Sequence, residues 1–434
     1  MTTCVASAAN AEPGKTATFA KDVAPIFQEK CEACHRPNSV APFSLISYED
    51  ARPRARSIKS AVAKRIMPPW DIDRTVGIQH FKGDRSLSSS QIDTIVSWVD
   101  AGAPLGDAKD LPAPLKWPAE EVWNFSELYG QPDLVIKSPA YTQKAQAQDA
   151  WYKPVVETGL TEPRWVRAIE IRPSTVKGRR ITHHALARLY QDEGEKTNPE
   201  EDAGPGLFME WAVGKQGEVM RPNSGKLMLP GSKIVWDIHY HSVGEDITDQ
   251  VELGIYLYPK GQEPKNRQVL ALFNAFSGGA SRLDIPPNTI AVHQGFHVMK
   301  QAGRVENFQP HMHLRGKAMS MEAILPNGTT QMLSYVGNFR FNWMTNYIYE
   351  DDDAPILPKG TILRITSWHD NTTANKDNPD PTQWVGWGDR TVDEMAHAWV
   401  NITYMNEDEY KAEVEKRKAA EAAKSSTTAQ QPPQ

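Results

Sequence analysis

Two of the three cysteines in this chain stand next to a histidine in the order C-x-x-C-H, as Cys31, Cys34 and His35. This is the attachment pattern of c-type haem, in which two thioether bonds hold the porphyrin and the adjacent imidazole binds the iron. A zinc site would need a second ligand pair nearby, and no cysteine follows Cys34. A thioredoxin-like redox motif would need a βαβ context, which is absent. The motif therefore predicts one covalently bound haem c.

The second axial ligand of that haem is expected from downstream in the same domain. Between His35 and the linker that starts near Pro104 there is one methionine, Met67, in the string RIMPPW. The two prolines after it end the preceding helix and stiffen the approach to the iron. His80 is the competing candidate, and a Met67 that only packs in the core is the structural alternative. A His/Met pair would raise the iron potential and make the haem an electron relay.

Helical periodicity flanks the haem motif on both sides. FAKDVAPIFQEK precedes it, and SSSQIDTIVSWVDAG follows with serines suited to an N-cap and Gly102 as a stop signal. We expect a small all-α domain over residues 17–107. The strings CEACHRPNSVAPFSL, MPPW and WVDAGAPLGD make this part similar to the short cytochrome c domains of multidomain bacterial proteins.

Ten of the twelve histidines lie beyond residue 130, and six of them form three close pairs. Residues two apart in a strand point to one face, so the third pair can converge on one ion, whereas the adjacent histidines of the first pair need a bulge or a strand end. Imidazole clusters without carboxylate neighbours suit zinc, copper, iron or nickel. The isolated histidines are expected to be structural. The pairs are His183 and His184, His239 and His241, and His311 and His313; the isolated ones are His80, His293, His297, His369 and His397.

The strings around these histidines are typical of β-strands. RAIEIRP, KIVWDIHYH, VELGIYLYP, TILRITSW and HAWVNITY alternate in polarity and are separated by turn residues, which predicts all-β sandwiches. A possible internal repeat suggests two sandwiches of similar plan. Its two copies are LPGSKIVWDIHYH and LPKGTILRITSWHD, and each is followed by an acidic turn and another strand. We expect a disordered start or leader remnant at 1–16, a linker at 108–130, sandwiches at 131–262 and 263–408, and a charged, partly disordered tail at 409–434.

As an ordered set, these motifs carry a resemblance. The chain resembles the copper type II, ascorbate-dependent monooxygenases, the family of dopamine β-monooxygenase and peptidylglycine α-hydroxylating monooxygenase. The motifs that carry this resemblance are, in order, HH, then HY after an apolar strand, then H-x-H-L-x-G, then D-E-M. The similarity covers about residues 131–405 and implies two jelly-roll sandwiches with one copper ion each.

Carried over residue by residue, the resemblance implies two different copper sites. His183, His184 and His239 match the site that stores and passes an electron. His239 is preferred to His241 because the family ligand is followed by tyrosine. A second set, His311, His313 and Met395, matches the site that binds oxygen and hydroxylates a C–H bond, and a thioether favours Cu(I). For Met395 the alternative is an ordinary core methionine.

Two departures from the family limit the expected substrate. Where the peptide-amidating members place an arginine for the substrate carboxylate, this chain has Gln309, and Trp399 replaces their substrate tyrosine. Peptide amidation is therefore not expected. No cysteine follows Cys34, so the disulfides of the animal enzymes are absent, and stability must come from core packing and metal.

Net charge and the lengths of the apolar runs limit the kinds of partner expected for this protein. A net charge of -6 argues against nucleic acid and anionic membrane surfaces. No apolar run approaches the roughly eighteen residues of a membrane span. The Ala-Asn-Ala of the N-terminal stretch is typical of a signal cleavage region, which favours a periplasmic or secreted bacterial protein.

The sequence thus predicts a copper-dependent monooxygenase that hydroxylates a small organic substrate with O2. Its electrons would pass from an external donor, an ascorbate-like reductant or a redox protein, through the fused haem. Two alternatives stay open: a haem/copper electron-transfer or copper-binding protein without oxygenase activity, and an oxidase or dehydrogenase whose electrons leave through the haem.

Overall fold

The computed structural model describes residues 16–37, 39–117, 122–193, 206–212, 215, 217–278 and 282–428. Its contacts divide the chain into two compact units. One comprises Met1–Trp70 and Arg85–Pro118, and the other Asp71–Asp84 and Ala119–Gln434. Taken together, the described residues form mostly β-sheet with few helices, as the sequence predicts. Residues 1–15 and 429–434, in the predicted leader and tail, lie outside the described residues.

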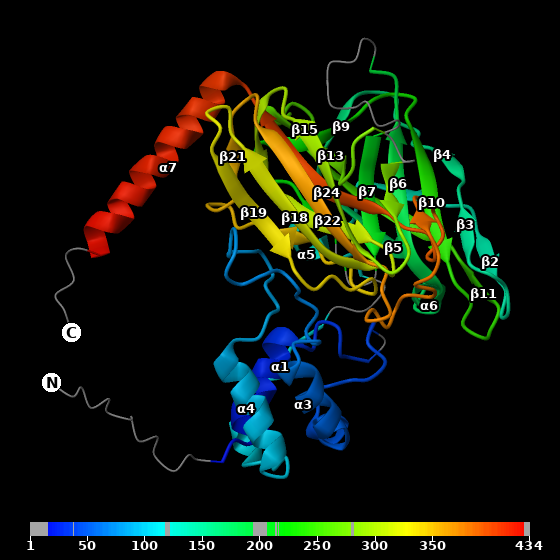
Figure 1. Ribbon diagram of the computed structural model, residues 1–434, viewed down its shortest axis with the longest axis vertical. Coiled ribbons are helices and arrows are strands. Elements are labelled where there is room, and N and C mark those ends of the chain that lie inside the picture. Colours follow the sequence, from blue (N-terminus) through cyan, green and yellow to red (C-terminus); the bar gives the residue numbers. More distant parts are fainter. Residues whose placement is uncertain are drawn as a thin grey trace. The chain divides into compact units, whose positions relative to one another are not determined.

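Among the described residues, the regular elements of the first unit are helical (Figure 1). The two stretches predicted as helices around the C-x-x-C-H motif are helical in the structure. Ser88 and Gln91 form a reciprocal capping box at the start of the second one, and Gly102, with a φ of 88°, follows its end. The elements are η1 (Phe19–Val23), α1 (Ala24–Lys30), α2 (Tyr48–Ala51), η2 (Arg52–Arg54), α3 (Ala55–Ala63), α4 (Ser89–Asp100) and η3 (Ala108–Asp110).

Aromatic residues from both ends of this unit meet in its core. The rings of Phe19 and Phe27 lie 5.8 and 6.4 Å from that of Trp98, which is fully buried. The indole N–H of Trp98 donates to the carbonyl of Pro104 at 3.0 Å, so the large ring is buried with its polar atom satisfied. This packing fixes α1, and with it the turn that carries Cys31, against α4.

Three sheets build most of the second unit (Figure 1). The largest has eleven strands and runs through both halves of the unit, because β9 and β13 pair in parallel at its middle. Its strands are β1 (Leu134–Lys137), β12 (Val251–Leu257), β5 (Arg164–Pro173), β8 (Glu218–Val219), β9 (Ser224–Met228), β13 (Asn266–Asn274), β24 (Ala396–Met405), β16 (Ala302–Val305), β17 (Asn307–Met312), β20 (Tyr347–Ile348) and β21 (Ile356–Leu357).

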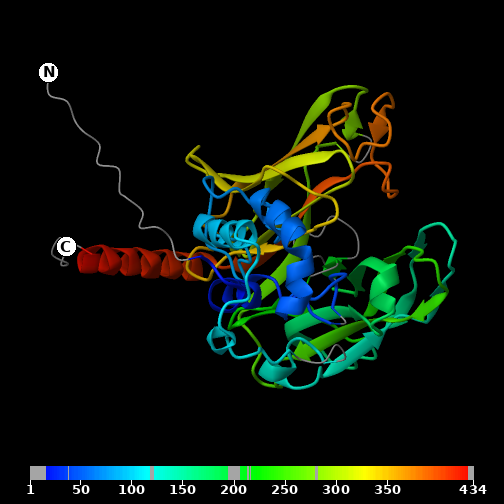
Figure 2. The ribbon, with the colours of Figure 1, turned by 90° about the horizontal axis from the view of Figure 1, so that it is seen from below.

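Two smaller sheets complete the two halves, and Figure 2 shows the halves as separate groups of strands. The first consists of β3 (Ala150–Tyr152), β4 (Val155–Glu157), β10 (Lys233–Tyr240), β6 (Thr182–Tyr190) and β7 (Gly206–Ala212); the second of β15 (Ile290–Val298), β22 (Ile362–Asp370), β18 (Gly316–Ile324) and β19 (Thr330–Val336). The remaining elements are the pairs β2 (Tyr141–Gln143) with β11 (Ile247–Asp249) and β14 (Asp284–Ile285) with β23 (Val385–Gly386), and the helices α5 (Ser126–Tyr129), α6 (Gly178–Ile181) and α7 (Glu407–Thr428).

All five strings that the sequence analysis singled out as strands are strands. In β10, Ile234, Trp236 and Ile238 alternate into the core shared with the large sheet. The two similar strings of the possible repeat form β10 and β22, one in each small sheet, and the strands that follow them form β12 and β24 in the large sheet. Corresponding strands therefore occupy corresponding sheets.

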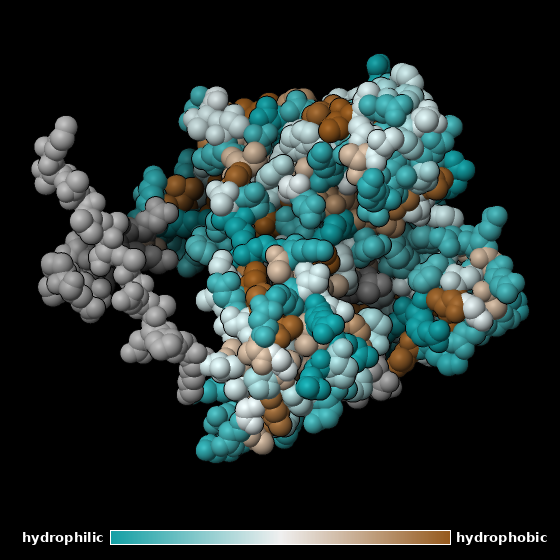
Figure 3. Space-filling model, turned by 60° about the horizontal axis from the view of Figure 1, so that its bottom comes forward, coloured by the Kyte–Doolittle hydropathy of each residue, from teal (hydrophilic) through white to brown (hydrophobic). Residues whose placement is uncertain are grey.

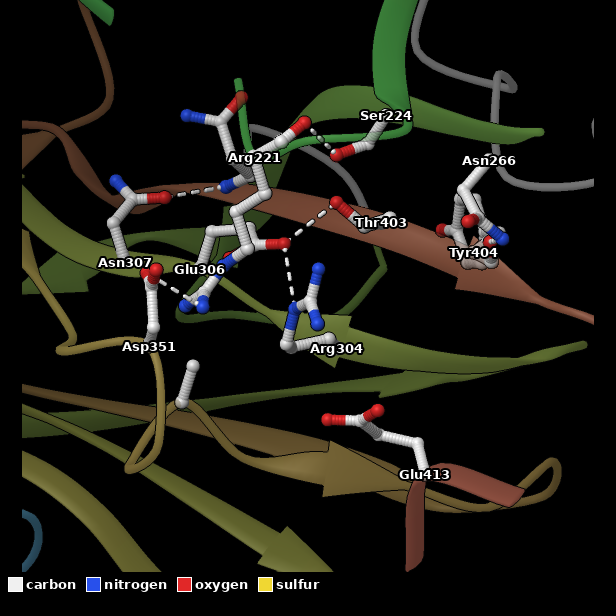
Figure 4. A network of polar contacts seen from close by, with 12 residues as sticks. Arg221, Ser224, Asn266, Arg304, Glu306, Asn307, Asp351, Thr403, Tyr404 and Glu413 are labelled. Atoms are coloured by element: carbon white, nitrogen blue, oxygen red, sulfur yellow. Dashed lines mark hydrogen bonds and ion pairs between the residues drawn. The ribbon is translucent and has the colours of Figure 1, made fainter. Parts of the chain in front are cut away.

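A buried ionic network joins the two halves (Figure 4). Arg221, in the turn before β9, contacts Glu306 between β16 and β17, with Nε 2.5 Å from Oε2. Arg304 and Thr403 donate to the other oxygen of Glu306 at 3.1 and 2.6 Å. Asp351 accepts from Arg221 as well, at 2.6 Å. Because both oxygens of the buried Glu306 carboxylate are engaged, the network resists relative movement of the two halves.

Residues 71–84 belong to the β unit by their contacts, although they lie within the range 17–107 expected to be helical. Ile72 pairs with Val336 of β19 and Phe81 with Tyr349, next to β20. Asp71 receives two hydrogen bonds from Arg340, at 2.6 and 3.0 Å. The extended backbone of this segment finds its partners on the sheets, which helical periodicity in the flanking sequence does not reveal.

The tail and the surface add little to the core. The predicted tail begins with a 22-residue helix, α7, which extends away from the sheets in Figure 1. On the face shown in Figure 3, hydrophobic residues are scattered among hydrophilic ones over the described part of the chain. None of the described helices is both long and apolar enough to cross a bilayer.

Candidate metal centres

Three imidazoles from two neighbouring strands converge in the first half of the β unit. His184 of β6 pairs with His239 of β10, and the next pair joins Thr182 to Tyr240, so His183 is the extra residue of a bulge. This bulge turns both adjacent histidines toward one point, as the sequence analysis required. Ligand atoms of His183, His184 and His239 all lie within 4.8 Å of one another, and these three residues are called the first histidine cluster.

The hydrogen bonds around the first histidine cluster select the ring nitrogens that face inward. His239 Nε2 lies 2.9 Å from a carboxylate oxygen of Asp149, so Nε2 carries the proton and Nδ1 keeps its lone pair. That Nδ1 is buried without a hydrogen-bond partner. The Nδ1 atoms of His183 and His184 lie 3.1 Å apart. Trp151 stacks on His239 at 4.6 Å and holds the ring in place.

His241 lies outside this group. Its ring centroid is 6.3 Å from that of His183, against 5.2 Å for His239. The structure therefore brings His239 into the cluster, which is the choice that the sequence pattern favoured.

Burial keeps His183 and His184 of the first histidine cluster neutral. It lowers the pKa of His183 to about 4, with further lowering by His239 and His241. The pKa of His184 is held well below its ordinary value, again mainly by burial. A neutral imidazole has a free lone pair, so these rings are in the protonation state that binds a metal ion at neutral pH.

The second half of the β unit holds His311, the penultimate residue of β17, and His313, just past the end of that strand. Their ring centroids are 5.4 Å apart. The backbone N–H of His313 donates to Glu394 Oε2 at 2.9 Å, and that of Arg315 donates to Oε1 at 2.6 Å. Glu394 thus ties this segment to the residues before β24. His311, His313 and Met395 are called the second histidine cluster.

In the second histidine cluster the protein engages Nδ1 of both rings. His313 Nδ1 donates to the carbonyl oxygen of Asp393 at 3.1 Å, since a carbonyl can only accept. His311 Nδ1 lies 3.3 Å from the sulfur of Met344, a weak acceptor. The Nε2 atoms therefore carry the free lone pairs. Burial lowers the pKa of both rings, that of His311 well below its ordinary value.

Met395 directly precedes β24 and is half-buried. It lines the same cavity as His311 and His313, so its side chain is not sealed in the core. His397 lies two residues further on, opposite His311 in the sheet, with ring centroids 4.7 Å apart and its Nε2 buried without a partner. From the sequence, His397 is expected to be an isolated structural histidine; its spacing of two residues from Met395 was the signal for its place here.

One cavity of about 800 Å³ is lined by both clusters, and it is called the central cavity. His184 of the first cluster and His311, His313 and Met395 of the second all contribute to its wall. Phe341 packs between the clusters, with its ring 5.5 Å from that of His183 and 5.8 Å from that of His313. Two potential metal centres therefore face a common space large enough for a small organic molecule.

The predicted haem ligands lie in the helical unit. Cys31 and Cys34 are free thiols, both half-buried, in the turn that follows α1. His35 Nδ1 donates to the carbonyl of Phe43 at 3.1 Å, which leaves Nε2 free to bind a metal from a fixed orientation. Burial lowers the pKa of His35, so its imidazole is neutral. Met67 is half-buried in the segment after α3. These residues fit a c-type haem in their chemistry and in the tautomer of His35.

The residues that orient the ligands were not predicted from the sequence. Glu394 stands beside Met395 in the D-E-M string, so adjacency could have pointed to it. Asp149, Phe341 and Met344 come from loops or strand ends distant in sequence from the histidines they contact, and no local pattern marks them.

No protein-family model and no curated protein matches this chain. Among solved structures, it is similar to the VP2 subviral particle of infectious bursal disease virus at a TM-score of 0.18 and 11% identity, over 63% of this chain and 73% of that one. Structures of the Gt and Gx strains of the same virus match at TM-scores of 0.17 with 11% and 9% identity, over 67% of this chain and 75% of each of theirs. Similarity this weak carries no argument, so function rests on the site.

Proposed function

We propose that this protein is a copper-dependent monooxygenase that hydroxylates a C–H bond of a small organic substrate, with electrons delivered through a c-type haem. The observation that carries the proposal is the common cavity, whose wall includes His184 of the three-imidazole first cluster as well as His311, His313 and Met395 of the second. An isolated structural histidine has no need of such an arrangement.

The two ligand sets suit different tasks. Three imidazoles whose ligand atoms lie within 4.8 Å of one another form a compact set suited to copper. Two imidazoles and a thioether form a softer set, which favours Cu(I) and leaves coordination positions open. Bound copper would supply the redox chemistry, in which the substrate C–H, O2, two electrons and two protons yield C–OH and water.

Side chains next to the two clusters fix the proton positions of the histidine ligands and fill the space between the clusters. Asp149 and Asp393 hold the protons on His239 Nε2 and His313 Nδ1, so that the opposite nitrogens face the ions. Phe341 fills the space between the clusters and limits the entry of water there. Electrons would enter at a haem attached through Cys31 and Cys34 with His35 and Met67 as axial ligands, a pair suited to electron transfer.

Metal analysis of the purified full-length protein is the first test. We expect one iron and two coppers per chain, and X-ray absorption of the reduced protein should show a copper–sulfur contact. One zinc with no copper would contradict the proposal.

Met395→Ile separates the two centres. We expect loss of the copper–sulfur contact and of oxygen uptake with a chemical reductant, while haem reduction and the paramagnetic copper signal of the first cluster persist. Met332→Ile is the matched control, because Met332 is a half-buried methionine of β19 that does not line the central cavity. If the wild-type protein binds both coppers and reduces its haem but consumes no oxygen, it is an electron-transfer protein instead.

A further inference from the structure

One wall of the central cavity carries a cation that the proposed chemistry does not use. His184, Leu186 and Arg188 alternate along β6, and all three line the cavity because residues two apart in a strand share a face. Arg188 is four positions beyond His184, so their Cα atoms lie about 13 Å apart along the strand. Arg188 therefore projects into the cavity well away from the first histidine cluster.

Arg188 differs from the other cation of this cavity in having no partner. Lys153 Nζ lies 3.0 Å from Asp237 and 3.9 Å from Asp389, so its charge is matched. The guanidinium of Arg188 makes no hydrogen bond or ion pair with any residue that the structure describes. Burial lowers the pKa of its guanidinium and the charge of Asp237 opposes this, but a guanidinium stays protonated at neutral pH. An unpaired, half-buried cation favours an anionic ligand.

Part of the cavity wall is apolar. Leu270 and Leu272 of β13 and Trp399 of β24 line the same cavity, and Leu272 lies opposite Trp399 in the sheet. These side chains offer no charge to a ligand, so they suit a hydrocarbon body rather than a sugar or a nucleotide.

Arg188 and the second histidine cluster line the same cavity, together with His397 of β24. His397 in turn stacks on His311 at 4.7 Å. A ligand whose anionic group is held at Arg188 would therefore extend its body along the apolar wall toward His311 and Met395.

We infer that the central cavity binds a small organic carboxylate with an apolar body, anchored by a bidentate ion pair to the guanidinium of Arg188. Describing this ligand as the substrate rests on the proposed function; the binding itself does not. Gln309, at the position where the peptide-amidating enzymes carry their anchoring arginine, is buried and donates to the carbonyl of Met344, so the anchor here lies on a different strand.

Calorimetric titration tests the inference with two matched probes, 3-phenylpropanoate and its neutral analogue 3-phenylpropanamide. The full-length protein is first treated with a chelator, so that the carboxylate cannot bind copper. We expect the carboxylate to bind at least tenfold more tightly than the amide. In Arg188→Gln this preference should vanish, and in Arg188→Lys it should shrink, because lysine lacks the planar bidentate donor. Lys233→Gln, which removes a half-exposed cation of β10 outside the cavity, should keep the full preference.

Equal binding of the two probes to wild-type protein, or a preference that survives in Arg188→Gln, would overturn the inference. Inorganic phosphate that binds as tightly as the carboxylate would overturn it too, because the apolar wall would then contribute nothing. If the carboxylate binds as expected and the copper-loaded protein consumes no oxygen, the proposed oxygenase function fails while the anion site stands. Oxygen uptake without carboxylate preference gives the reverse result.

Discussion

The carboxylate of Glu394 accepts the backbone N–H of His313 at 2.9 Å, and it thereby joins the two chain segments that supply the second histidine cluster. Its other oxygen accepts from Arg315 at 2.6 Å. His313 and Glu394 are 81 residues apart in the sequence. The Glu394 side chain nevertheless fixes the position of the H-x-H segment relative to the segment before Met395. The spacing of His313 and Met395 in space is thus set by a residue that binds no metal itself.

Glu394→Gln should weaken this arrangement. Glutamine offers one acceptor oxygen and one NH2 group, so one of the two backbone N–H groups loses its acceptor. We expect copper affinity at the second cluster to fall about tenfold or more, with the first cluster unaffected. Competition with a chromogenic chelator measures the affinity, and the copper–sulfur contact reports the site. Glu322→Gln, on β18 outside the cavity, is the control.

Asp149→Ala should affect the first cluster in a similar way. The carboxylate holds the proton on His239 Nε2, and without it the imidazole can rotate or exchange tautomers. We expect copper affinity there to fall by about 10- to 100-fold, and Asp149→Asn to lie between this variant and wild type because its amide oxygen still accepts. Glu157→Ala, an exposed acid on β4, should bind copper normally. An unchanged affinity in Asp149→Ala would remove Asp149 from the site.

Glu306→Gln should destabilise the junction of the two halves. The side chain pairs with both Arg221 and Arg304 in a buried network, and its loss leaves the carboxylate of Asp351 to balance these two guanidinium groups. We expect the free energy of unfolding to fall by about 3 kcal/mol. Urea denaturation with copper removed measures this. Lys260→Gln, at an exposed ion pair, should change it by less than about 1 kcal/mol.

The metal-free protein should lose stability as the pH falls. The pKa of His183 is about 4 in the fold, against about 6.5 in an unfolded chain. The folded state binds fewer protons between these values, so the contribution of His183 is present above pH 6.5 and is lost as the pH falls toward 4. We expect wild type to lose up to about 1.4 kcal/mol per pH unit more than His183→Gln in this window.

Urea midpoints of wild type and His183→Gln at about pH 7 and about pH 5 measure the difference. His80→Gln, at an exposed histidine, should follow wild type. A wild-type curve parallel to that of His183→Gln would mean that this imidazole is not buried in neutral form.

Local pattern was enough to predict the elements. Periodicity and caps gave the helix after Ser88, and alternation gave β10, β12, β22 and β24, because side-chain direction repeats every 3.6 residues in helices and every two in strands. The same rule placed His311 near His313, and the adjacency of His183 and His184 demanded the bulge that β6 has.

The sequence by itself therefore determined the strand and helix types, the choice of candidate ligands and the chemistry those ligands favour. Only the tertiary structure decided which of them meet: His239 joins the first cluster and His241 does not, and Arg188 faces the space where His311 and Met395 lie. The physical reason is that these contacts cross between strands far apart in the chain. Sheet register and buried polar contacts, such as those of Asp149 and Glu394, set such distances, and neither leaves a periodic trace in the sequence.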